Sequence, residues 1–183
     1  MFELITPPAA EPFVLDDVRQ ALRLDHDTDD TLVMRLGQTA RRLIERRLGL
    51  AVADQVWRLT HEGRADDPLT LRPGPVREIT SVELRYGDAP HVASDEWRFI
   101  RSRPSKVEIT APRTSGGAWL EEVRITFASG RTDLSGVPAD LVQAIMMLTA
   151  HYYENREAVA EGRYVAVPAG VETILQSLRE AQL

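Results

Sequence analysis

The densest group of side chains that could bind a metal ion is an acidic run near the N-terminus. Residues 25–30 read Asp-His-Asp-Thr-Asp-Asp, so four carboxylates and one imidazole fall within six positions. A calcium-binding EF-hand loop that began at Asp25 would need glycine at its sixth position and glutamate at its twelfth, where this chain has Asp30 and Leu36. The run is therefore predicted to be a solvated turn in which Asp29 or Asp30 caps the next helix.

The spacing of the histidines does not predict a metal site. Zinc sites without cysteine usually need several histidines, and this chain has no cysteine. None of its histidines has a second histidine at helical or hairpin spacing; they are His26, His61, His91 and His151. We expect no metal ion, and the lack of cysteine, which excludes disulfides, suits a cytoplasmic origin.

No motif with a known catalytic mechanism occurs in the chain. Neither a Gly-x-Ser-x-Gly elbow nor a Walker loop or dinucleotide fingerprint is present. Paired carboxylates such as Glu121 and Glu122 occur, but nothing singles out one pair as a general acid and base. We therefore expect no enzymatic activity and no cofactor.

A basic cluster marks the end of the second predicted helix, where arginines stand at positions 41, 42, 46 and 47. They could bind DNA phosphates, or they could complement the helix dipole and keep an exposed face hydrated. The formal net charge of −6 argues against a protein whose main task is to hold nucleic acid. The dipole interpretation is favoured, and a DNA-binding accessory protein remains an alternative.

Helices at both ends of the chain and strands between them must position these residues. Three prolines within residues 1–12 predict an extended N-terminal arm. The first helix is expected over residues 15–24. The second ends near Leu48 with Gly49 as its cap, and its inward side chains are predicted to be Leu32, Leu36, Ala40 and Leu43.

In the middle of the chain the apolar pattern changes to a period of two, which is typical of strands. Turn signals separate the strands and no helix intervenes, so the sheet is predicted to be antiparallel. The expected strands are residues 55–62, a short one from 69 that ends at a Pro-Gly-Pro turn, 79–86, 97–101, 106–110 and 122–128.

The central helix is predicted to run from Val137 to Glu157, with Pro138 in the first turn, where proline is tolerated. Two adjacent apolar stripes along it indicate burial on more than one side. Whether the second stripe faces its own chain or a neighbouring copy is left open. A last helix follows Pro168 and carries an apolar stripe of Val171, Ile174, Leu175 and Leu178.

The 183 residues are expected to form a single domain of class α+β. It is a helical bundle (two N-terminal helices, a long central helix and a C-terminal helix) with an inserted antiparallel β-sheet. Residues 13–50 and 138–183 make the helical part, and residues 53–130 the β-rich insertion. No apolar run approaches the roughly 18 residues of a membrane span, so no membrane association is expected.

The order of these elements resembles the head–tail connector (adaptor) proteins of long-tailed phages and of related gene transfer agents. The resemblance covers nearly the whole chain and rests on short motifs in sequence order. They are Arg23–Asp30, Trp57 on a strand, the Leu71–Val76 turn followed by Ile79–Val82, Phe127–Gly130, Val137–Pro138 at a helix start, His151–Glu157 at its end, and Val167–Pro168 before a terminal helix.

The resemblance implies a structural role in the neck of a virion or particle that is assembled in the bacterial cytoplasm. Such proteins form a ring, typically of twelve subunits, beneath the portal. The ring extends the DNA channel and joins the head to the neck and tail. The implied partners are further copies of the chain, the portal protein, a stopper or tail-completion protein, and DNA that passes through without sequence-specific binding. A stopper or tail-completion protein of the same region is an alternative.

The resemblance also suggests which residues make the contacts. The C-terminal segment commonly reaches the portal in this family, so the candidate portal contacts are Val167, Val171, Ile174, Leu175, Leu178 and Leu183. The polar end of the central helix combines tyrosine with charged residues, which suits either a subunit contact or an ordinary helix end. The candidate subunit-interface residues are Tyr153, Glu154, Asn155, Arg156 and Glu157.

Overall fold

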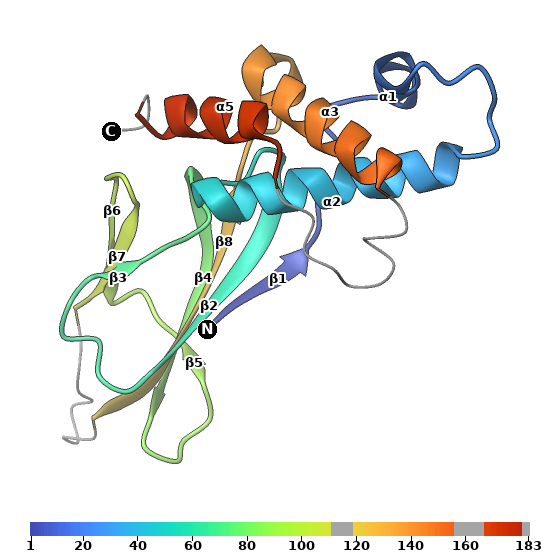
Figure 1. Ribbon diagram of the computed structural model, residues 1–183. Helices are drawn as coiled ribbons and strands as arrows, with labels where there is room; N and C mark the ends of the chain where they lie inside the picture. Colours follow the sequence, from blue (N-terminus) through green and yellow to red (C-terminus); the bar gives the residue numbers. More distant parts are fainter. Residues whose placement is uncertain (111–118, 156–166, 181–183) are drawn as a thin grey trace. The chain divides into compact units, whose positions relative to one another are not determined.

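The computed structural model describes residues 1–110, 119–155 and 167–180 (Figure 1). The chain divides into two compact units. The β unit comprises Met1–Ala9 and Gly49–Thr132, and the helical unit comprises Ala10–Leu48 and Asp133–Leu183. The predicted α+β class, with a sheet inserted between helices, is confirmed.

The larger sheet of the β unit has five antiparallel strands around one central strand. Its spatial order is β1-β2-β8-β4-β5, and each neighbouring pair is antiparallel. Strand β8 lies in the middle because it is long and strongly apolar, with Val123, Ile125 and Phe127 fully buried. The strands are β1 Phe2–Thr6, β2 Gln55–Glu62, β8 Leu120–Ser129, β4 Val76–Tyr86 and β5 Val92–Ala93.

A second, three-stranded sheet completes the β unit, so the predicted antiparallel strands form two sheets. Its order is β3-β7-β6, with β3 at Leu69–Thr70, β7 at Lys106–Ile109 and β6 at Trp97–Ile100. Both sheets contribute to one hydrophobic core. The fully buried members of this core are Leu71, Leu84, Val107, Leu120, Val123, Ile125 and Phe127.

The helical unit is organised around α3, Ala139–Glu154, which packs against α1, α2 and α5 (Figure 1). Helix α1 is Leu15–Leu22, α2 is Asp30–Leu48 and α5 is Ala169–Glu180, and a short 3-10 turn, Leu134–Gly136, precedes α3. The expected burial on more than one side is confirmed. In the second predicted stripe, which consists of Val142, Met146, Thr149 and Tyr153, Met146 and Thr149 are buried. The buried side chains of α3 are Leu141, Ala144, Ile145, Met146, Leu148 and Thr149.

The buried face of α2 differs from the predicted one. Ala40 is buried as expected, but Leu32, Leu36 and Leu43 are only half-buried. The face that packs inward is rotated and contains Val33, Gly37, Ala40, Arg41, Ile44 and Glu45.

A small residue explains part of this rotation of α2. A Cβ atom at Gly37 would lie 2.7 Å from the ring of Phe13, so only glycine admits the aromatic side chain there. Gly49, which follows the helix, has a φ of 67°, and the predicted C-terminal cap is confirmed.

The N-terminal arm also differs from the prediction. Residues Phe2–Thr6 form β1, which pairs with β2 as an edge strand of the larger sheet. In the described part of the chain no helix is both long enough and apolar enough to cross a membrane.

Candidate functional site

The acidic run is tied to the helices on either side of it. Asp30 is the first residue of α2, and its carboxylate lies 2.6 Å from the Arg19 guanidinium of α1. This hydrogen bond raises the pKa of Arg19 above its ordinary value. Asp29 accepts a hydrogen bond from the Tyr153 hydroxyl at 2.5 Å. No group of three or more potential ligands lies close enough to hold a metal ion among the residues that the structure describes.

The polar end of α3 mixes internal contacts with exposed surface. Tyr153 is half-buried and uses its hydroxyl within the helical unit. The Asn155 side chain donates to the His151 carbonyl at 2.8 Å and so caps the helix. Glu154 is exposed. Of the five predicted interface residues these three are described, whereas Arg156 and Glu157 lie outside the described residues.

The apolar side chains of α5 are buried to different degrees. Val171 and Leu175 are buried in the helical unit, where α5 packs against α3 and α2. The packing against α3 is close, since a Cβ atom at Gly170 would lie 2.8 Å from Met147. The remaining described portal candidates, Val167, Ile174 and Leu178, are half-buried and thus partly accessible, and Leu183 lies outside the described residues.

Polar contacts also fix α5 to α2. Glu172 forms an ion pair with Arg47, and the Arg179 guanidinium donates to the Arg47 carbonyl at 2.8 Å. Helix α5 is therefore held both by apolar packing and by polar contacts with α2.

The predicted basic cluster does not form one surface. Arg41 is 1% exposed and lies between two carboxylates, those of Glu11 at 2.6 Å and Glu45 at 2.5 Å. The interpretation of this arginine as part of an exposed basic face is wrong, because two acids compensate its desolvation. Arg42 and Arg46 are exposed.

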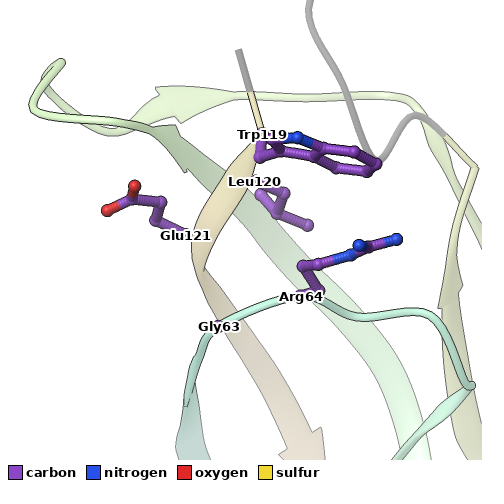
Figure 2. Close-up of a pocket in the computed structure, with 5 residues that line it drawn as sticks. All are labelled: Gly63, Arg64, Trp119, Leu120 and Glu121. Atoms are coloured by element: carbon purple, nitrogen blue, oxygen red, sulfur yellow. The ribbon is translucent and has the colours of Figure 1, made fainter.

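An open hollow of about 460 Å³ lies at one end of the β unit, and no sequence motif predicted it. The Arg64 guanidinium stacks on the Trp119 ring at 3.9 Å from the ring centroid, and Figure 2 shows the two side chains facing each other while the Glu121 carboxylate points away. Arg64 also lies 3.1 Å from Asp66. These groups are solvated, so the hollow lacks the buried polar groups of a small-molecule site. Its lining residues are Gly63, Arg64, Trp119, Leu120 and Glu121.

Glu122 is the centre of a charged network on the larger sheet. Its carboxylate lies 3.1 Å from Arg85, 2.8 Å from Arg124 and 3.0 Å from His91. Burial by itself raises the pKa of Glu122, but the hydrogen bonds from Arg124 and Arg85 outweigh this and the pKa lies below its ordinary value. The network joins β4 and β8.

These features are surfaces and structural contacts. Comparison with known proteins shows what the whole chain is similar to. No protein among those with curated functions matches the chain. The structure is similar to a chain in "Neck of empty GTA particle computed with C6 symmetry", with a TM-score of 0.76 and 25% identity over 98% of this chain and 95% of that chain.

Two further structures agree with this likeness. One is a chain in "Virion of native gene transfer agent (GTA) particle", with a TM-score of 0.75, 25% identity and coverage of 98% and 95%. The other is a chain in "Neck of native GTA particle computed with C12 symmetry", with a TM-score of 0.71, 25% identity and coverage of 98% and 94%. Residues 13–181 match the family model HCP, described as head completion protein. The resemblance drawn from the sequence is thereby confirmed, and the chain belongs to the head completion protein family.

Proposed function

We propose that this protein is a head–tail adaptor, a structural component of the neck that joins the head of a phage or gene transfer agent particle to its tail. The observation that carries the proposal is the likeness to neck proteins over 98% of the chain. It extends through both compact units, so it does not depend on one common substructure. The role is structural.

The neck structures of the similar proteins have sixfold and twelvefold symmetry, which supports assembly of this chain into a ring. A ring closes when one surface of a subunit binds a different surface of the next subunit. We assign twelve copies to the ring. We also assign the candidate residues Tyr153 to Glu157 to a contact between subunits; among those that the structure describes, Glu154 is the exposed one.

The portal protein is the proposed partner of α5. Val171 and Leu175 anchor this helix to its own unit, which leaves Val167, Ile174 and Leu178 as the partly accessible apolar side chains. A helix that presents such a row can lie in a groove of a partner. The ion pair between Arg47 and Glu172 helps to set its direction.

DNA is proposed to pass through the ring without sequence-specific binding. The formal net charge of −6 suits such a passage, because like charges prevent the phosphate backbone from adhering to the wall. The opposite face of the ring then receives a stopper or tail-completion protein.

Deletion of the gene tests the adaptor function. In a strain that produces the particles, loss of the protein is expected to yield DNA-filled heads without tails, and a plasmid copy is expected to restore them. Tailed particles in the deletion strain would contradict the proposal. Electron microscopy of labelled particles distinguishes the alternative position, since an adaptor contacts the portal whereas a stopper or tail-completion protein lies farther along the neck.

The exposed Arg42 and Arg46 favour one second candidate, an accessory DNA-binding protein. It predicts that the isolated protein binds DNA with an affinity that falls as salt rises, and that the double variant Arg42→Ala, Arg46→Ala binds more weakly. Absence of binding at low salt removes this candidate.

A further inference from the structure

The exposed apolar side chains of this protein gather at the two edges of one sheet. Six large hydrophobic residues of the described chain are exposed, and four of them lie on or next to the edge strands of the five-stranded sheet. Met1, Phe2 and Ile5 are 81%, 42% and 39% exposed at the β1 edge, and Val92 is 53% exposed on β5. Exposed apolar groups that cluster in this way mark an interaction site.

Strand β1 buries little within its own subunit. Four of its five residues are exposed, and only Leu4 is half-buried. Side-chain packing therefore contributes little to holding the strand, and its ladder with β2 is its main support. The stability of such a strand increases most when a further strand pairs with its free edge and covers its exposed side chains.

The free edge of β1 also presents backbone groups. Met1 and Thr60 exchange both of their backbone hydrogen bonds, and Phe2 pairs with Leu59 at the next position. In an antiparallel ladder bonded and non-bonded pairs alternate, so the N–H and C=O groups of Phe2 and Leu4 point away from β2. Such a row of groups is a template for another strand.

The opposite edge of the sheet is only partly covered. Strand β5 has two residues and pairs with Glu83 and Leu84 of β4, which has eleven residues. The remaining part of β4 has no strand on this side in the described chain. This edge thus combines open backbone with the exposed Val92.

We infer that neighbouring subunits of the ring meet edge to edge, with β1 of one copy adding to the β4–β5 edge of the next copy. The inference deepens the proposed function and rests on it, because the ring supplies the second copy. A closed ring needs two different and complementary surfaces on each subunit. The two ends of one sheet meet this need, because strand addition supplies both hydrogen bonds and apolar contact.

Charge placed at the edges is the first test. Ile5→Lys and Val92→Lys change exposed side chains, so each subunit should keep its melting temperature, while a lysine on a sheet edge opposes pairing. Val14→Lys is the matched control, since Val14 is 61% exposed but belongs to the helical unit. In the deletion strain each edge variant is expected to lower the number of tailed particles by about tenfold or more, as a tenfold weaker contact between subunits would. The control variant is expected to leave this number unchanged.

Cross-linking is the second test. Because the chain contains no cysteine, only the introduced cysteines can react. In particles that carry Ile5→Cys together with Val92→Cys, a short bismaleimide is expected to give a ladder of oligomers on a denaturing gel. Either single variant is expected to stay monomeric. Dimers from Ile5→Cys alone would overturn the inference, because they would show β1 against β1.

The outcomes separate the two proposals. If the unmodified protein is absent from the neck, the adaptor function fails. If it is present but the double-cysteine variant reacts without forming oligomers, or if the lysine variants assemble as well as Val14→Lys, the edge contact alone is overturned.

Discussion

The Tyr153 hydroxyl near the end of α3 donates a hydrogen bond to the Asp29 carboxylate at the start of α2, 124 residues away in the sequence. This bond connects the acidic run to the polar end of the central helix. Two features that looked independent in the sequence are therefore one structural unit. The bond also directs the Tyr153 hydroxyl into the subunit, whereas Glu154 is exposed.

Tyr153→Phe is expected to lower the free energy of unfolding of the helical unit by about 1–2 kcal/mol, because a partly buried hydrogen bond to a carboxylate is lost. Urea denaturation followed by circular dichroism measures this. Tyr152→Phe is the matched control on the neighbouring residue and should change stability by less than about 0.5 kcal/mol. Equal stability of the two variants would show that the Tyr153 bond contributes nothing.

The buried Arg41 provides a stronger test of the helical unit. Arg41→Ala leaves the carboxylates of Glu11 and Glu45 facing each other without their cation, and removing one partner of a buried ion pair costs about 3–5 kcal/mol. Arg42→Ala, one residue further on an exposed face, should be nearly neutral. Chemical denaturation measures the stability of both variants. Similar unfolding midpoints would mean that the ion pairs of Arg41 with Glu11 and Glu45 do not stabilise the helical unit.

Most strands and all four described helices were predictable from the sequence. Gln55–Glu62 was predicted with the boundaries that it has, because apolar and polar residues alternate there between turn signals. The orientation of α2 was predicted wrongly because periodicity places leucine inside and arginine outside. Here Gly37 receives the Phe13 ring, and Arg41 is neutralised partly by Glu11, 30 residues away. Neither contact can be recognised from the residues close to Gly37 or Arg41 in the sequence.

Long-range pairing also explains what was missed at the surface. Strand β1 was predicted as an arm because prolines dominate the first twelve residues, while its partner β2 begins at Gln55. The stacking of Arg64 on Trp119 likewise joins residues that are far apart in the chain. The candidate contacts on α5 came from a family resemblance, and only the structure divides them into Val171 and Leu175 inside and the partly accessible Val167, Ile174 and Leu178.

Acid should weaken the β unit through Glu122. Its pKa is lowered in the folded state, so its contribution to stability is present above the unfolded pKa of 4.5 and is lost as the pH falls through the lower folded pKa. Glu122→Gln is expected to be less stable at pH 7 and to lose part of the acid dependence below pH 4.5. Melting temperatures between pH 3 and pH 7 measure both effects. Glu62→Gln is the control, since Glu62 is exposed at the end of β2.

The different burial of the apolar side chains of α5 predicts different effects of substitution. Leu175→Ala removes a side chain that is 2% exposed and should destabilise the helical unit by about 2–5 kcal/mol. Ile174→Ser and Leu178→Ser alter side chains that are only half-buried and should cost clearly less. If these partly accessible side chains bind the portal, the double serine variant will remain folded but will not sediment with purified portal protein, whereas Thr173→Ser, on an exposed position of the same helix, will bind normally. Normal binding by the folded double variant would move the portal contact away from α5, and loss of folding in that variant would show that these side chains belong to the core.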